Sequence, residues 1–128
     1  SHKDWYLLFN RSVGFISPSF TTSEHHPAVR LYYYDTKTGK LVNYTQYRFN
    51  IDKDLEMEFV YTSPSEYGMK GLEFNDLYGL TMEMKNNQTS VNGMRFYSNY
   101  WAGTPPKYDS RSMKGMINSI IEPLGIPM

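Results

Sequence analysis

The chain has 128 residues, which is enough for one domain and too few for two ordinary ones. Hydrophobic residues make up 40% and charged residues 20%, a composition typical of globular rather than disordered proteins. The formal net charge is zero, and no stretch approaches the ~18 consecutive apolar residues of a membrane span. We therefore expect neither a nucleic-acid polymer as a partner nor a transmembrane segment.

The start of the chain predicts two short strands. Residues 3–9 are rich in aromatic and aliphatic side chains and favour a strand, and residues 10–12 favour a turn. Residues 13–16 are apolar without alternation, which indicates a second strand that is covered on both faces. Pro18 cannot donate a hydrogen bond to a neighbouring strand, so this strand should end before it.

A polar loop at residues 21–27 separates these strands from a predicted β-hairpin. Residues 29–34 and 41–49 are rich in β-branched and aromatic side chains, and in the turn between them Gly39 can take a positive φ. Residues 56–61 alternate charged and apolar side chains, which is typical of a half-buried strand.

The pattern changes to a helical one after this strand. Pro64 suits the first turn of a helix, with Ser63 as its N-cap. Residues 75–84 predict a helix because their apolar side chains recur on one helical face. The side chains on that face are Leu77, Leu80, Thr81 and Met84.

Two further helices complete the predicted fold. The aromatic run at residues 96–101 predicts one, which residues 103–106 break, and residues 112–121 predict another, which stops before Pro123. The fold class is therefore α+β, with strands and a hairpin over about residues 3–61 and a helical part after them. We divide the chain into residues 1–62, with the strands and hairpin, and residues 63–128, the helical subdomain.

Several short motifs also resemble a known family. They are Ser17-Pro18-Ser19, Thr21-Thr22, His26-Pro27 and Arg30-Leu31-Tyr32 followed by Asp35. In this order and spacing they resemble the acid sphingomyelinase-like phosphodiesterases, which are calcineurin-like metallophosphoesterases. The chain departs from the family pattern at His26, where the family usually has Asn. The resemblance implies that the chain would complete the layered α/β sandwich of a metallophosphoesterase.

The first two residues allow two interpretations. Ser1-His2 is either a leftover from protein expression or a frayed terminus, or it is the second half of the family's Gly-His-Ser/Thr-His motif. The resemblance favours the second, since the family commonly has an acidic residue two positions later, as Asp4 is here. It implies that His2 is a metal ligand, with zinc in a two-metal site whose other ligands precede this chain. No catalytic residue is assigned within the chain.

The loop with two histidines is a candidate substrate contact. Its candidate residues are Ser23, Glu24, His25 and His26. Adjacent loop residues are poorly placed to form a complete metal site, but imidazoles can bind a phosphate-linked head group by hydrogen bonding or charge. The resemblance places this loop beside the substrate pocket. The alternative is an ordinary solvated loop. Arg30, on the strand that follows, is predicted to pair with an acidic side chain or to stack on a tyrosine.

Two signals disagree about the cellular compartment. The chain has no cysteine, which by itself leans towards the cytosol. Three N-x-S/T sequons, which begin at Asn10, Asn43 and Asn87, favour a glycosylated product of the secretory pathway. The resemblance agrees with the sequons and implies a secreted or lysosomal protein.

The functional hypothesis is a part of a metal-dependent phosphodiesterase that hydrolyses sphingomyelin-like phosphocholine esters or nucleotide phosphates. The chain alone should be inactive, and its expected partner is the upstream catalytic part of the same enzyme. The alternative is a stand-alone, non-enzymatic β-plus-helix binding module with an aromatic surface.

Overall fold

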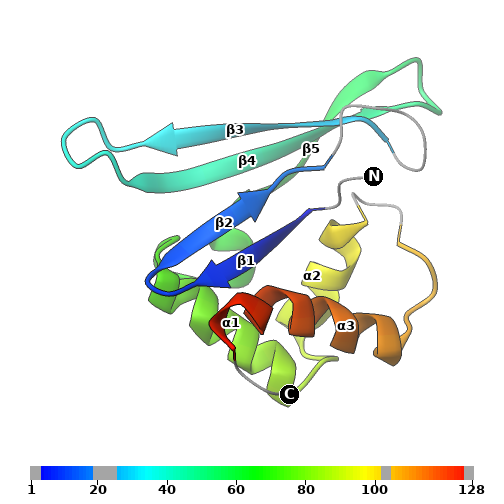
Figure 1. Cartoon of the computed structure of the whole chain (residues 1–128). Coiled ribbons are helices and arrows are strands. Elements are labelled where there is room, and N and C mark those ends of the chain that lie inside the picture. Colours follow the sequence, from blue (N-terminus) through cyan, green and yellow to red (C-terminus); the bar gives the residue numbers. More distant parts are fainter. Residues whose placement is uncertain (1–3, 19–25, 102–104, 126–128) are drawn as a thin grey trace.

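The computed structural model describes residues 4–18, 26–101 and 105–125, and it confirms the predicted α+β fold class. The described residues form two antiparallel sheets, of orders β1-β2 and β3-β4-β5, together with three α-helices and two 3₁₀ turns (Figure 1). The strands are β1 (Trp5–Phe9), β2 (Ser12–Ile16), β3 (Ala28–Tyr34), β4 (Leu41–Asn50) and β5 (Glu56–Ser63). The helices are α1 (Phe74–Asn86), α2 (Val91–Tyr100) and α3 (Ser110–Ile121), and the 3₁₀ turns are η1 (Ser65–Tyr67) and η2 (Glu122–Leu124).

The first hairpin differs from its prediction in how much of it is buried. β1 pairs with β2 through a tight turn in which Arg11 takes a φ of 66°. From Val13 to Ile16 every residue of β2 is half-buried and none is fully buried. Both faces of this strand are therefore covered in part, with Val13 and Phe15 packed against the core, but not fully as predicted.

The second sheet is the predicted hairpin with one more strand. Gly39 takes the expected positive φ, 72°, in the turn between β3 and β4. The register places Arg30 of β3 opposite Gln46 of β4, and Gln46 opposite Tyr61 of β5. Three polar side chains from distant parts of the sequence therefore form one row across the sheet.

The first helix begins later than expected. Ser63 is not an N-cap: it is the last residue of β5, where it pairs with Tyr44 and is buried. Only the short turn η1 follows Pro64, and Gly68, in the left-handed conformation, ends it. The prediction of a helix capped by Ser63 is wrong because pairing with β4 keeps this residue extended.

The α-helices otherwise agree with their predictions. The side chains of α1 that are buried are the four predicted ones, Leu77, Leu80, Thr81 and Met84. Ser90 caps α2, accepting a hydrogen bond from the backbone N–H of Gly93, and Asp109 caps α3 in the same way through Arg111. As expected, α3 ends before Pro123, which lies in η2.

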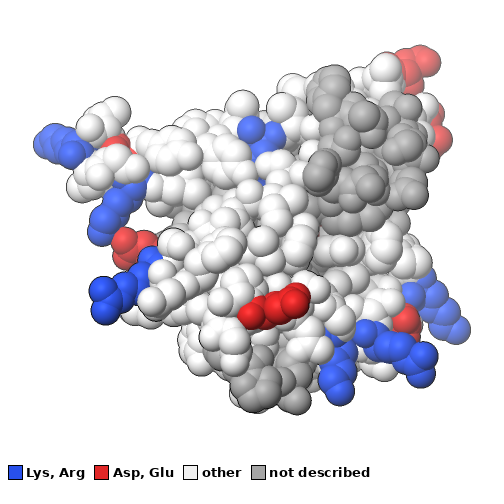
Figure 2. All heavy atoms as spheres, viewed as in Figure 1, with Lys and Arg blue, Asp and Glu red and all other residues white. Residues whose placement is uncertain are grey.

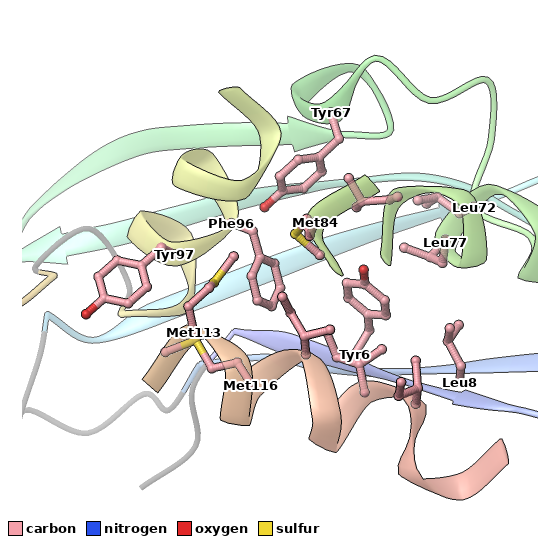
Figure 3. Packing of buried hydrophobic residues seen from close by; sticks show 14 of the residues in the cluster. Tyr6, Leu8, Tyr67, Leu72, Leu77, Met84, Phe96, Tyr97, Met113 and Met116 are labelled. Atoms are coloured by element: carbon pink, nitrogen blue, oxygen red, sulfur yellow. The ribbon is translucent and has the colours of Figure 1, made fainter. Parts of the chain in front are cut away.

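One apolar core joins the strands to the helices. Tyr6 and Leu8 extend from β1 towards the helices and lie among buried side chains such as Phe96, Met84 and Met113 (Figure 3). The ring centroids of Tyr6 and Phe96 are 5.8 Å apart in an edge-to-face arrangement. The two predicted parts of the chain, residues 1–62 and 63–128, therefore share a core, and the boundary between them stays a prediction.

The β1–β2 hairpin lies between the helices and the three-stranded sheet (Figure 1). The inner face of that sheet contacts the hairpin, for example where the rings of Phe15 and Tyr44 meet edge to face. The outer face is exposed and apolar, with Val29 and Leu31 on β3 and Met57 and Phe59 on β5. Phe59 is 62% exposed although it contacts the ring of Tyr47.

Charged side chains are dispersed over the face of the molecule shown in Figure 2. On the face shown in Figure 2, most positive and negative side chains lie towards the edge, around a mainly neutral centre. This pattern agrees with the net charge of zero. In the parts of the chain that the structure describes, no helix is long and apolar enough to cross a bilayer.

Candidate functional site

A buried polar cluster lies on the inner face of the three-stranded sheet. Its members are Asp4, Arg30, Gln46, Tyr44 and Tyr61. Four of them come from adjacent strands of one sheet, whereas Asp4 immediately precedes β1 and reaches the cluster from the other sheet. The cluster therefore ties the two sheets together by hydrogen bonds and charge.

The centre of the cluster is an ion pair between Asp4 and Arg30. Nη2 of Arg30 donates to Oδ1 of Asp4 at 2.5 Å, and these side chains are only 1% and 6% exposed. The hydroxyl of Tyr61 donates to the other carboxylate oxygen, Oδ2. Both oxygens of Asp4 thus have a donor, as a buried carboxylate requires.

Arg30 contacts three further side chains. Its Nε donates to Oε1 of Gln46 at 2.8 Å, and its Nη2 lies 3.3 Å from the hydroxyl of Tyr61. The guanidinium carbon lies 4.0 Å from the centre of the Tyr44 ring, a cation–π distance. The prediction that Arg30 pairs with an acid or stacks on a tyrosine is confirmed in both forms.

The pKa values of the pair reflect opposing effects. Burial raises the pKa of Asp4, while the charge of Arg30 and the hydrogen bonds from Tyr61 and Arg30 oppose that rise. Burial alone would lower the pKa of Arg30, but the neighbouring Asp4 carboxylate outweighs it, so the pKa of Arg30 is raised. Arg30 is therefore a permanent cation in the middle of the fold.

Two donors of this cluster have no hydrogen-bond partner among the residues that the structure describes. Nη1 of Arg30 and Nε2 of Gln46 are buried and unpaired, although the same side chains bond to each other through Nε and Oε1. Buried N–H groups without a partner are uncommon, and an ordered water is the usual acceptor.

A second polar group continues along the same face of the sheet. Arg48 of β4 faces Glu58 of β5, and its Nε donates to Oε1 of Glu58 at 2.9 Å. The side-chain amide of Asn50 also donates to this carboxylate. Hydrogen bonds from Arg48 and Asn50 lower the pKa of Glu58. This group is partly exposed, unlike the Asp4–Arg30 pair.

Of the predicted loop residues, the structure places His26. It is 7% exposed, and its Nδ1 accepts a hydrogen bond from the backbone N–H of Ile51 at 3.1 Å. This hydrogen bond connects His26 to the residue that follows β4. A substrate contact by His26 stays a prediction. The other predicted site residues, His2, Ser23, Glu24 and His25, lie outside the described residues.

The three sequons differ in exposure. Asn10 lies in the exposed turn between β1 and β2, and Asn87 is the exposed C-cap residue of α1. Asn43 is half-buried within β4, where it pairs with Tyr33. The Oδ1 of Asn87 accepts hydrogen bonds from the backbone N–H and the hydroxyl of Thr89 in the same sequon.

The sequence did not point to Gln46 and Tyr61 as members of a site. The available signal was the alternation of side chains along each strand, which puts both on the same face as Arg30 once the register is known. Within residues 4–18, 26–101 and 105–125, no three His, Cys, Asp or Glu side chains form a group that could hold a metal ion.

Comparison with known proteins connects the chain to one group of enzymes. It is 33% identical over 106 residues to "Sphingomyelin phosphodiesterase A" of Dictyostelium discoideum. The match covers 72% of this chain but only 18% of that protein, so the chain spans less than a fifth of the length of this relative. No family model matches the sequence. The similarity supports a sphingomyelinase-like relationship.

Proposed function

We propose that this chain is part of a secreted or lysosomal, metal-dependent phosphodiesterase. The observation that carries the proposal is the similarity to a sphingomyelin phosphodiesterase over most of the chain. The substrates are phosphoesters, either phosphocholine esters related to sphingomyelin or nucleotide phosphates. The remaining catalytic groups come from the upstream part of the same enzyme, and this chain is inactive without them.

The proposed metal is zinc in a two-metal site, for which this chain supplies His2 as a ligand. A bound zinc pair would polarise the phosphoryl group and generate a hydroxide nucleophile. His2 lies outside the described residues. The Asp4 carboxylate, two positions later, is no free ligand, since Arg30 and Tyr61 occupy its two oxygens. The remaining ligands must therefore come from elsewhere in the protein.

Replacing His2 with alanine in the complete protein should lower zinc content and phosphodiesterase activity together. The reason is that a metal ligand contributes to both, whereas a frayed terminal residue contributes to neither. The measurements are elemental analysis and hydrolysis of sphingomyelin and of a nucleotide substrate. Alanine at Ser23, Glu24 and His25 is the comparison, expected to change KM or substrate preference with zinc content intact. If zinc content and phosphodiesterase activity are unchanged in the His2→Ala variant, His2 is not a metal ligand.

The proposed location implies N-linked glycans, and the three sequons should differ in occupancy. We expect glycans at Asn10 and Asn87, which are exposed, and less at Asn43, which lies within a paired strand. The protein secreted from a eukaryotic cell should lose mass on treatment with an N-glycosidase. Asn10→Gln and Asn87→Gln should each remove one increment, while Asn43→Gln serves as the control. An unglycosylated protein would contradict the proposed location.

A binding module remains the second candidate, and the exposed outer face of the three-stranded sheet favours it. Val29, Leu31, Met57 and Phe59 present apolar side chains there. In the enzyme proposal, the upstream part of the enzyme covers this face. Sedimentation separates the two proposals: a chain that stays monomeric alone, and does not bind the upstream part when the two are co-expressed, supports the module.

A further inference from the structure

Both tryptophans of the chain line one cavity, at the junction of β1, α2 and α3. The cavity has a volume of about 500 Å³, which is within the range of ligand-binding pockets. Its aromatic side is formed by Trp5, the first residue of β1, and by Tyr100 and Trp101 at the end of α2. From α3, the side that faces these rings includes Ser112, Gly115 and Met116.

The elements around the cavity are fixed to one another. The backbone N–H of Asp4 donates to the carbonyl of Tyr100 at 3.2 Å, which joins the start of β1 to the end of α2 (Figure 1). Met116 is 7% exposed and belongs to the apolar core that β1 and α2 share with α3. Trp5, Tyr100 and Trp101 are each half-buried. The aromatic rings are therefore held by the fold and still accessible to a ligand.

The arrangement of the rings suits an organic cation. The ring centroids of Tyr100 and Trp101 are 5.2 Å apart, and the ring planes meet at 77°. Two nearly perpendicular rings with a third nearby form a corner in which a quaternary ammonium group can contact several π faces. None of the described residues that line the cavity is charged. A metal ion or a primary ammonium needs oxygen ligands or hydrogen-bond acceptors, whereas a trimethylammonium group has no N–H to satisfy.

We infer that this cavity binds a phosphocholine group, with the trimethylammonium end against the three aromatic rings. Arg111 and Lys114 are exposed on α3, next in sequence to the lining residues Ser112 and Gly115. Their positive charges favour a ligand that carries a phosphate beside its cation over a bare cation. Such binding does not require the proposed phosphodiesterase activity or its metal site.

A matched pair of glycine variants tests the site in the complete protein. Gly115 of α3 and Gly79 of α1 are both exposed, and at each the place of a Cβ atom has no atom within 4 Å. Gly115→Leu adds a side chain at the cavity, whereas Gly79→Leu makes the same change away from it. Leucine favours a helix more than glycine does, so both variants should fold. Isothermal titration calorimetry with phosphocholine should show at least tenfold weaker binding in Gly115→Leu and unchanged binding in Gly79→Leu.

A neutral analogue tests the role of the cation. In the tert-butyl analogue of phosphocholine, carbon replaces the cationic nitrogen while the shape and the phosphate are kept. We expect the analogue to bind about tenfold more weakly, because the rings no longer attract a positive charge. Equal affinity for the two compounds would overturn the inference, since the cavity would then be an ordinary apolar one. An equal loss in both glycine variants, or no binding of phosphocholine by the wild-type protein, would overturn it as well.

Vesicles separate the two sources of a phosphocholine group, a soluble molecule and a lipid head group. If the protein sediments with phosphatidylcholine vesicles but not with phosphatidylglycerol vesicles, and Gly115→Leu abolishes this, the cavity takes a membrane head group. If it binds phosphocholine but neither kind of vesicle, the cavity takes the soluble compound. Zinc content and hydrolysis are measured separately. A protein that has both, but binds no phosphocholine at this cavity, overturns this inference and leaves the proposed function intact.

Discussion

Replacing Arg30 alone with methionine should lower the free energy of unfolding by about 3–5 kcal/mol, a large part of the ~5–15 kcal/mol stability of a typical domain. The variant leaves the Asp4 carboxylate, only 6% exposed, without its counter-ion. It also removes the donor to Oε1 of Gln46. Most of this loss comes from the Asp4 carboxylate, which stays buried without a counter-ion. Lost packing contributes little, because methionine fills much of the volume of the arginine side chain. Urea denaturation followed by circular dichroism measures the change.

The double variant Asp4→Leu, Arg30→Met is the control for that result. It removes both charges, so we expect it to recover most of the lost stability. An exposed pair offers a second comparison. Lys40 and Glu73 form an ion pair at 2.9 Å, but both side chains are 66% exposed, and Lys40→Met should have little effect. A loss in Arg30→Met no larger than in Lys40→Met would contradict this account of the cluster.

Local patterns were sufficient for most of the secondary structure. The alternation in β5, the aromatic and β-branched runs of β3 and β4, and the apolar face of α1 depend on neighbouring residues only, and all appear as predicted. The prediction for Ser63 is wrong because the conformation of this residue depends on a strand partner far along the chain. Ser before Pro is a plausible helix start, yet pairing with Tyr44, 19 positions earlier, makes Ser63 a strand residue.

The sequence predicts the type of partner that Arg30 needs, but not which residues form the candidate site. An arginine within an aromatic strand needs a counter-ion or a ring, so the type of partner for Arg30 followed from the sequence. The partner itself, Asp4, is 26 positions away, immediately before the first strand of the other sheet. Its identity depends on how the two sheets pack, which no local pattern specifies. His26 shows the same limit, since its acceptor role depends on Ile51, 25 positions away.

Raising the pH above 10 should destabilise the fold steeply, because four buried tyrosines among the described residues have raised pKa values. They are Tyr6, Tyr44, Tyr61 and Tyr67. Burial raises the pKa of Tyr44 to about 12, and the pKa values of the other three are raised as well, mainly by burial. A pKa that is higher in the folded state means that the folded chain holds its phenol protons more tightly. No stability is lost below pH 10, the ordinary pKa of tyrosine, and stability falls as the unfolded chain ionises above it.

The slope gives the size of this effect. Each tyrosine contributes up to ~1.4 kcal/mol per pH unit above pH 10, so the four together contribute up to ~5 kcal/mol per unit. A stability of ~5–15 kcal/mol would be exhausted within about one to three pH units.

Urea midpoints measured at successive pH values, together with tyrosinate absorbance, test this expectation: the buried phenols should ionise only as the chain unfolds. Tyr6→Phe should reduce the slope by about a quarter, since it removes one of four similar groups. Ionisation of all the tyrosines near pH 10 in a chain that remains folded would contradict it, because the burial that raises their pKa values would then not exist in solution.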